Sequence, residues 1–312
     1  MEQRMIIEFN DHIDLTGLLK KYDHDFDEYV TMQLGYDGNI YILFNKSIPE
    51  RIDGMFVPTE SNSVFDVLVL RIDWDEEKVI NEEYYHLGVQ KMNYSFIQPI
   101  QGGFLLVSAR CSYKKDGPEN NAVIVDHEGN KITEFCLGDG ISHCMVNPSS
   151  EMITGYFDEG IFGNYGWEEP LGACGVRAWG RDGRDIWKAD KEIYDCYAMN
   201  ISDKGDIWYY YYNDFRLVRV NINGSYDREY DPEIEGADSL IISEDEYTLV
   251  MDIGYDEHEE FVMRRIIGDR LSDEIPLIFT YEGEKSNVRL ISSYGSRAVF
   301  VDDGNRMMIK RF

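Results

Sequence analysis

The segment Ala122-Val-Ile-Val-Asp126, followed by Glu128-Gly129 and then by Lys131-Ile-Thr-Glu-Phe135, decides the fold of this chain. Two apolar stretches of strand length flank a turn that contains glycine, and this pattern is a strong local signal for a β-hairpin. The arrangement recurs at Gly175–Trp187 around Asp182-Gly183, and at Leu217–Tyr226 around Asn223-Gly224. Three hairpins at matching places in consecutive units predict a repeat protein built from strands.

Each of these hairpins follows an earlier one in which a short polar turn joins two apolar strands. Six segments have this form, and they begin roughly 40 to 65 residues apart, which is typical of the blades of a propeller. The six segments are Thr31–Phe44, Tyr94–Ala109, Ser142–Phe157, Cys196–Tyr212, Ser239–Ile253 and Val288–Asp302.

We therefore predict an all-β fold, namely a six-bladed β-propeller of four-stranded blades that forms a single domain over residues 1–312. The last repeat supplies three strands, and the segment 4–9 offers the missing fourth. Pairing of this N-terminal strand in the last blade would close the ring and remove the exposed sheet edges. The expected blades are 31–90, 91–141, 142–193, 194–238, 239–285, and 286–312 together with 4–9. One short helix is expected from Leu15 to Tyr22, with Asp14 as its N-cap.

The composition excludes several classes of partner. The net charge of −29 argues against nucleic acid, because binding to phosphates needs a basic surface. It disfavours an anionic membrane surface for the same reason. The N-terminus shows no secretory signal, and no apolar run has the length of a membrane helix. Five cysteines without paired spacing suggest reduced thiols, so we expect a cytoplasmic protein.

The candidate binding site is the segment from Tyr156 to Gly175, which combines glycines, large aromatic residues and four carboxylates. It would connect the second and third strands of its blade, as Asn45–Phe65 and Cys111–Asn121 do in the two preceding blades. Loops of this length are uncommon unless they are functional or disordered, and these three would crowd one face. The alternative is a loop packed over its own blade, with Phe162 and Trp167 as plugs. The predicted binding residues are Tyr156, Asp158, Glu159, Phe162, Asn164, Tyr165, Trp167 and Glu168.

Other candidate residues are better explained by structure than by chemistry. Trp208–Tyr212 places aromatic side chains on both faces of a strand, as packing between blades requires. His143 is expected to be a hydrogen-bonded structural residue. The carboxylates of Asp23–Asp27 alternate as in a calcium loop but lack its glycine and its final glutamate, so we interpret them as an acidic connector. The cluster Asp256–Glu260 could bind a divalent cation adventitiously, but its place in a tight hairpin favours a solvated turn.

Part of the chain resembles a group of uncharacterised bacterial propeller-like proteins. The resemblance is carried by Gly155–Asn164 with Gly166-Trp167 and Pro170–Gly172, and by Asp195–Asn200 followed by Trp208–Tyr211. It covers roughly residues 140 to 240 and implies a propeller fold in a bacterial cytosol. It transfers no catalytic residue, because no activity is known for the group.

The sequence favours a non-catalytic binding module that recognises a protein or a small ligand of basic character on one propeller face. No cofactor, metal, nucleic acid or membrane is expected. No catalytic motif is present, although a propeller can assemble catalytic residues from distant parts of its sequence. The alternative function is a metal-dependent hydrolase or lactonase with carboxylate ligands in the central channel.

Overall fold

The computed structural model describes residues 4–221, 223, 225–255 and 257–312, so Gly224 of one expected turn and Asp256 of the acidic cluster lie outside the described residues. The chain separates into two compact units. The first unit comprises Met1–Tyr22, Ile72–Ile80 and Tyr197–Phe312, and the second comprises Asp23–Arg71 and Asn81–Cys196.

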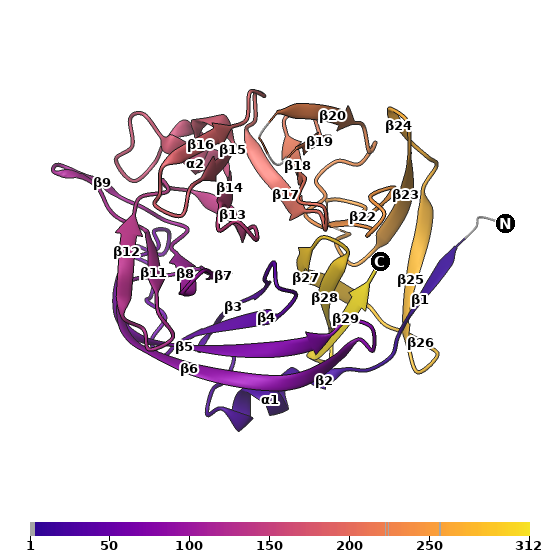
Figure 1. Ribbon diagram of the computed structural model, residues 1–312, viewed down its shortest axis with the longest axis horizontal. Coiled ribbons are helices and arrows are strands. Elements are labelled where there is room, and N and C mark those ends of the chain that lie inside the picture. Colours follow the sequence, from indigo (N-terminus) through magenta and orange to yellow (C-terminus); the bar gives the residue numbers. More distant parts are fainter. Residues whose placement is uncertain (1–3, 222, 224, 256) are drawn as a thin grey trace. The chain divides into compact units, whose positions relative to one another are not determined.

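Three four-stranded sheets make up most of the second unit, and in each of them the strands pair in chain order (Figure 1). Residues 72–80, at the turn between the third and fourth strands of the first sheet, are the exception and belong to the first unit. The first sheet contains β3 (Tyr29–Leu34), β4 (Ile40–Asn45), β5 (Glu60–Asp73) and β6 (Lys78–Met92). The second contains β7 (Phe96–Ile100), β8 (Gly103–Val107), β11 (Ala122–Val125) and β12 (Lys131–Phe135). The third contains β13 (Ile141–Val146), β14 (Met152–Tyr156), β15 (Val176–Trp179) and β16 (Asp185–Lys188).

The sheets of the first unit are less uniform. One four-stranded sheet contains β17 (Asp195–Ile201), β18 (Ile207–Tyr212), β19 (Arg216–Val220) and β20 (Tyr226–Tyr230), and another contains β27 (Val288–Tyr294), β28 (Arg297–Asp302), β29 (Arg306–Arg311) and β2 (Ile13–Asp14). A seven-stranded sheet combines six strands that lie between them in sequence with one strand from the N-terminal segment. Its members are β21 (Leu240–Ile242), β22 (Thr248–Asp252), β23 (Phe261–Ile267), β24 (Arg270–Leu271), β25 (Ile275–Tyr281), β26 (Glu284–Lys285) and β1 (Met5–Phe9).

Two parts of the predicted architecture are wrong. Within the described ranges the sheets include five four-stranded blades, not six, because the expected fifth blade is the seven-stranded sheet. The strand expected to complete the last blade, 4–9, instead runs parallel to β25, with Met5 opposite Leu277 and Phe9 opposite Tyr281. The short strand β2 pairs with β29 of the last blade in its place. The apolar pattern of β1 identifies an edge strand but does not determine which edge it joins.

Helices occupy little of the chain. Helix α1 (Leu15–Lys21) confirms the predicted helix to within one residue. Its buried residues Leu15, Leu18 and Leu19 have the spacing of one helical face, and Asp14 stands at its N-cap position. Helix α2 (Asp158–Phe162) and the 3-10 helix η1 (Leu171–Cys174) lie inside the long loop of the third blade, where no helix is expected from the sequence.

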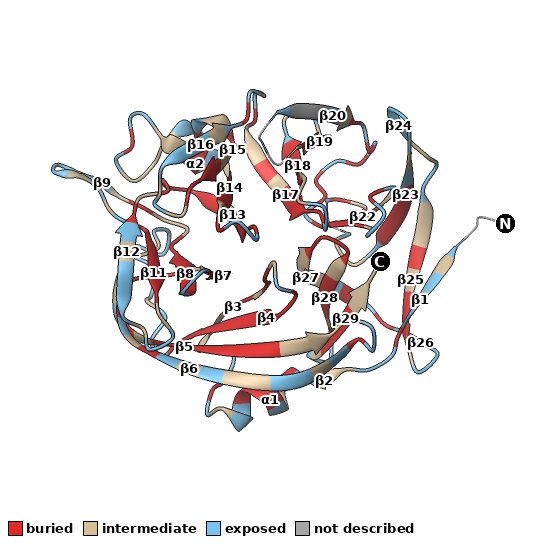
Figure 2. Ribbon diagram, viewed as in Figure 1, coloured by how far each residue is buried: buried red, intermediate tan, exposed pale blue. Residues whose placement is uncertain are grey.

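The core of each unit lies between consecutive sheets that pack face to face. In the second unit, a buried cluster joins Leu43 and Val67 of the first sheet to Leu106 and Val123 of the second. The outer strands are half exposed, and Figure 2 shows β12 largely exposed beside the fully buried β11. Burial on both faces of the inner strands explains their nearly continuous apolar sequences.

The aromatic run on β18 follows the same rule and confirms the packing interpretation. Trp208, Tyr209, Tyr210 and Tyr211 are buried, whereas Tyr212 at the strand end is 41% exposed. Trp208 and Tyr210 belong to the cluster that joins this sheet to Leu249 and Met251 of β22 and to other residues of the next sheet.

The position of β1 predicts that alanine substitutions at two of its residues, Phe9 and Ile6, have very different effects on stability. Phe9 is 2% exposed and its ring stacks on Phe279 with centroids 5.5 Å apart, whereas Ile6 is 65% exposed. We expect Phe9→Ala to lower the free energy of unfolding by about 3 to 5 kcal/mol. The control Ile6→Ala should change it by less than about 0.5 kcal/mol. Urea denaturation measures both values, and equal effects would contradict the observed pairing of β1.

Candidate functional site

The three long loops of the second unit contact one another, as the sequence predicts. They span residues 46–59, 108–121 and 157–175, and together we call them the three-loop surface. The amide of Tyr113 donates to the carbonyl of Tyr165 at 2.8 Å, and the Tyr165 hydroxyl donates to the carbonyl of Val57 at 2.9 Å. The indole Nε1 of Trp167 donates to the carbonyl of Cys111 at 2.6 Å. All three loops are therefore fixed to each other by hydrogen bonds.

An ion-pair network links two of these loops to the body of the blade, and its pair between Arg110 and Asp139 is buried. The guanidinium of Arg110 binds both carboxylate oxygens of Asp139, at 3.0 and 2.9 Å, and also binds Glu159. Its outer side is covered by the ring of Tyr165, whose centroid lies 4.1 Å from the guanidinium carbon. Burial raises the pKa of Asp139, while the amide of Cys111 and the charge of Arg110 oppose that rise. Removing one partner of such a buried pair would leave the other charge uncompensated.

Two of the predicted binding residues are structural. Tyr156 is fully buried, and its hydroxyl donates to the carbonyl of Leu137 and accepts from the Thr154 hydroxyl at 3.0 Å. Burial accordingly raises the pKa of Tyr156. Trp167 is 7% exposed, so neither residue offers contact area to a partner. Trp167 therefore agrees with the alternative prediction, in which its side chain is packed over the blade instead of contacting a partner.

The remaining predicted residues lie at or near the surface. Phe162 is 64% exposed, so it is not a plug. Asp158 and Glu168 are also exposed, and Glu159 is held by Arg110. The side-chain oxygen of Asn164 accepts from the Tyr165 amide at 2.7 Å and shapes the turn that follows helix α2.

Exposed apolar side chains from all three loops extend this surface. They come from the 46–59 loop, from β9 (Tyr113–Lys114) of the β9–β10 ribbon, whose second strand is Gly117–Pro118, and from α2. Exposed patches of this kind are typical of sites that bind another macromolecule. The exposed residues are Ile48, Ile52, Met55, Phe56, Tyr113 and Phe162.

The glycines of the third loop allow α2 to approach the body of the blade closely. A Cβ atom on Gly160 would lie 2.4 Å from the carbonyl oxygen of Asp139, and one on Gly172 would lie 2.5 Å from the carbonyl oxygen of Gly160. Gly140, which faces Gly160 and has a φ of +70°, completes this contact. Glycine is therefore needed here for backbone contact as well as for conformation.

This close contact predicts the effect of adding one methyl group. Gly160→Ala should lower the free energy of unfolding by about 1 to 3 kcal/mol, because the new atom overlaps a backbone oxygen. Gly304→Ala is the matched control, since its Cβ would approach no atom more closely than 3.3 Å, and that atom is a side-chain oxygen of Asp302 rather than backbone. Chemical denaturation of both variants measures the difference. Equal stabilities would show that α2 does not lie against residues 139–140.

A carboxyl pair lies beside α2. The ring of Phe162 packs against Tyr194 with centroids 5.2 Å apart, and the next residue, Asp195, receives a hydrogen bond from the backbone of Asp158. Burial, together with the nearby charge of Asp158, raises the pKa of Asp195 from 3.8 to about 6. A raised pKa in the folded protein means that ionisation of Asp195 destabilises the fold.

The pH dependence of stability follows from this shift. Between pH 3.8 and about 6, Asp195 keeps its proton in the folded state but loses it in the unfolded chain. The free energy of unfolding therefore falls as the pH rises through this range. Asp195→Asn should flatten this slope and raise stability near neutral pH by about 1 kcal/mol, since solvent screens part of the penalty. Thermal melts across this pH range test the prediction against Asp190→Asn, an exposed carboxylate. Parallel profiles for the two variants would contradict it.

The other histidine-containing motifs of this unit are structural. His143 donates from Nε2 to the carbonyl of Cys196 at 3.1 Å, as expected. His24, within the acidic connector, is buried rather than solvated. Its ring bonds Glu28 at 2.6 Å and the Tyr84 hydroxyl at 2.8 Å.

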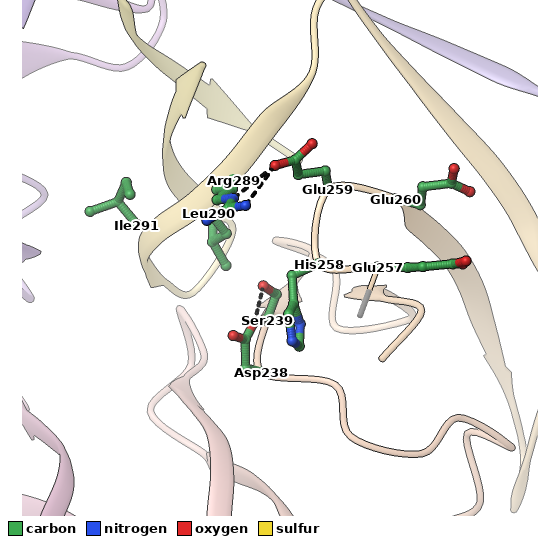
Figure 3. Close-up of a pocket in the computed structure, with 9 residues that line it drawn as sticks. All are labelled: Asp238, Ser239, Glu257, His258, Glu259, Glu260, Arg289, Leu290 and Ile291. Atoms are coloured by element: carbon green, nitrogen blue, oxygen red, sulfur yellow. Dashed lines mark hydrogen bonds and ion pairs between the residues drawn. The ribbon is translucent and has the colours of Figure 1, made fainter. Parts of the chain in front are cut away.

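A second candidate site lies in the first unit. A pocket of about 550 Å³ opens between residues 238–239, residues 257–260 and β27. Figure 3 shows His258 beside Asp238 and Ser239, while Glu259 is turned toward Arg289. The lining residues are Asp238, Ser239, Glu257, His258, Glu259, Glu260, Arg289, Leu290 and Ile291.

The centre of this pocket wall is a histidine bonded to a buried carboxylate. His258 Nδ1 donates to Asp252 Oδ2 at 2.5 Å and lies 3.5 Å from Asp238 Oδ1. Burial alone would lower the pKa of His258, but the hydrogen bond to Asp252 and the charge of Asp238 raise it. Burial and the charge of Asp238 raise the pKa of Asp252. His258 is thus more than part of a solvated turn, and no sequence motif links it to residues 6 and 20 positions away.

Comparison with known proteins supports the fold. No protein-family model and no curated protein matches the chain. The chain resembles a protein in the crystal structure of a mitotic checkpoint complex, with a TM-score of 0.53, 10% identity, and coverage of 97% of this chain and 95% of that one. It also resembles KlHsv2 with loop 6CD replaced by a Gly-Ser linker, with a TM-score of 0.50, 11% identity, and coverage of 90% and 76%.

These neighbours are β-propeller proteins of the WD40 type. At such low identity the likeness shows the fold alone: the chain is an all-β propeller with four-stranded blades. The resemblance to a bacterial group stays a prediction. Among the described helices, none has the length and apolar character that crossing a membrane requires.

Proposed function

We propose that this protein is a non-catalytic interaction module whose three-loop surface binds a partner protein. One observation carries the proposal: loops from three consecutive blades are bonded into a single surface that still exposes Ile52, Met55, Phe56, Tyr113 and Phe162. The polar groups of Arg110, Tyr165 and Trp167 are already paired within the protein. What remains available to a partner is apolar area together with exposed charged side chains, among which six carboxylates outnumber the basic groups. The exposed carboxylates are Glu50, Asp53, Asp116, Asp158, Glu168 and Glu169, and the exposed basic residues are Lys46, Arg51, Lys114 and Lys115.

The charge of this surface favours a basic partner. Asp158, Glu168 and Glu169 are exposed around Phe162, while Lys114 on the neighbouring loop is bound to Glu60 and Glu119, both at 2.6 Å. The net charge of −29 would steer a basic partner toward the protein and repel nucleic acid and anionic membranes. A lysine or arginine beside apolar residues is the chemistry that this surface fits.

A partner of this kind would be met in a reducing compartment, and we propose the cytoplasm. The thiols of Cys111 and Cys136 lie with their sulfur atoms 3.7 Å apart and are not joined in a disulfide. Cys111 is a buried residue of the three-loop surface itself, and Trp167 donates to its carbonyl. Thiols this close would be oxidised readily in an oxidising compartment.

Peptide selection tests the proposal without knowledge of the natural partner. Random linear peptides displayed on phage are selected on the full-length protein, and the best are synthesised for affinity measurements by fluorescence anisotropy. We expect enrichment of peptides in which Lys or Arg adjoins apolar residues. The double variant Met55→Ala and Phe162→Ala should weaken their binding about tenfold or more, because exposed contact area is removed.

Two further double variants distinguish binding at the three-loop surface from binding elsewhere on the protein. Glu168→Gln with Glu169→Gln should weaken binding and reduce its salt dependence, because two exposed charges are lost. The control double variant Tyr247→Ala and Ile267→Ala removes equally exposed apolar side chains from the first unit and should leave affinity unchanged. Peptides that bind the loop variant and the control variant alike would overturn the proposal.

A further inference from the structure

We propose that Asp238, Asp252 and His258 form a binding site for a divalent transition-metal ion such as Zn²⁺ or Mn²⁺, with water in the remaining coordination positions. The site lies in the first unit and is independent of the three-loop surface. One carboxylate oxygen from each aspartate and one imidazole nitrogen lie within 4.8 Å of one another. Two oxygen ligands and one nitrogen ligand form a donor set that such ions accept.

The three donor atoms are gathered in one place, although one of their spacings is shorter than that of a coordination shell. Ligands about 2.1 Å from a tetrahedral ion lie about 3.4 Å from each other. His258 Nδ1 lies 3.5 Å from Asp238 Oδ1 and 2.5 Å from Asp252 Oδ2. To bind one ion, His258 Nδ1 and Asp252 Oδ2 must therefore move about 1 Å further apart than they are here. His258 lies on a surface turn, where its side chain can make this movement.

Asp252 is positioned as a ligand by its own hydrogen bonds. Its side chain is fully buried, and its Oδ1 accepts from the amides of Asp238 and Ser239, both at 2.9 Å. These bonds fix the carboxylate and leave Oδ2 directed at His258. The same two amides place Asp238 beside it, so one turn holds both carboxylates together.

Metal binding would replace a proton. The distance of 2.5 Å between His258 Nδ1 and Asp252 Oδ2 requires a shared proton, which an ionised aspartate accepts from the imidazole. A metal ligand nitrogen must be unprotonated, so binding moves this proton to Nε2, or releases it to solvent where the imidazole is charged. The ion then takes over the role of the proton in holding the two side chains together.

The surroundings favour a cation over an anion. Glu257, Glu259 and Glu260 line the same pocket, and its single lining guanidinium, Arg289, is already paired with Glu259 at 2.9 Å. Carboxylates therefore outnumber cationic groups among these lining residues, which raises the local concentration of cations. The volume of about 550 Å³ above the cluster leaves room for water or a small anionic ligand on the ion.

Titration of the full-length protein tests the site. The protein is stripped with a chelator, and binding of Zn²⁺ and Mn²⁺ is measured by isothermal titration calorimetry near neutral pH. We expect one saturable equivalent. Asp238→Asn and His258→Ala should each weaken binding at least tenfold, since each removes one of three protein ligands. Absorption of the Co²⁺ complex supplies a second readout, because loss of the imidazole nitrogen in His258→Ala shifts the ligand-field bands.

The matched control distinguishes a defined site from diffuse attraction. Glu257→Gln removes the same charge from the same pocket as Asp238→Asn, but Glu257 is not a ligand, and we expect a change smaller than about threefold. The proposal is overturned if wild-type protein shows no saturable equivalent. It is also overturned if Asp238→Asn retains wild-type affinity, or if Glu257→Gln weakens binding as much as Asp238→Asn. Both altered ligand side chains are at least partly exposed, so thermal melts should confirm that the variants are folded.

Discussion

Burial of the inner strands on both faces is the constraint on which the rest of the structure depends. A strand such as β4, whose six residues are all buried, is stable only when another sheet covers each face. Consecutive sheets therefore pack against one another, and within one unit Val67 of β5 and Leu106 of β8 belong to the same buried cluster. The loops that leave these strands are free of this requirement, so their sequences can serve binding instead of folding.

The three-loop surface depends on a second interaction of a different kind. A loop of more than a dozen residues loses much conformational entropy when it is ordered, and these loops have few apolar residues in the core. Arg110 compensates by binding Asp139 from its own blade and Glu159 from the next. The ion pair between Arg110 and Asp139 is buried, so loss of either partner would leave an uncompensated charge. Because Arg110 also binds Glu159, ordering of the 108–121 loop favours ordering of the 157–175 loop.

The local structure was largely predictable from the sequence, whereas long-range pairing was not. Hairpins such as β11–β12 follow from alternating apolar residues and a glycine turn, which are local signals. The pairing of β1 with β25 joins residues about 270 positions apart, and the short apolar strand Met5–Phe9 fits either of two sheet edges. The sequence identified the loop at 156–175 but not the burial of Tyr156 and Trp167, because an aromatic residue beside glycine suits a core and a surface equally well.

Ligand sites built from separate turns are harder still to predict. His258 belongs to an acidic run that resembles an ordinary solvated hairpin, and its partners Asp238 and Asp252 are single aspartates on other segments. The pairing of β21 with β22, with Leu240 opposite Met251, brings Asp238 close to Asp252. The pairing of β22 with β23, with Asp252 opposite Phe261, brings His258 of the connecting turn to the same place. The register of β21, β22 and β23 thus brings Asp238, Asp252 and His258 together, although they lie on separate segments of the chain. The same register places Asp252 at the buried end of its strand, where a carboxylate is costly unless it is bonded. The two amide bonds and His258 offset that cost, and a bound cation would offset it further.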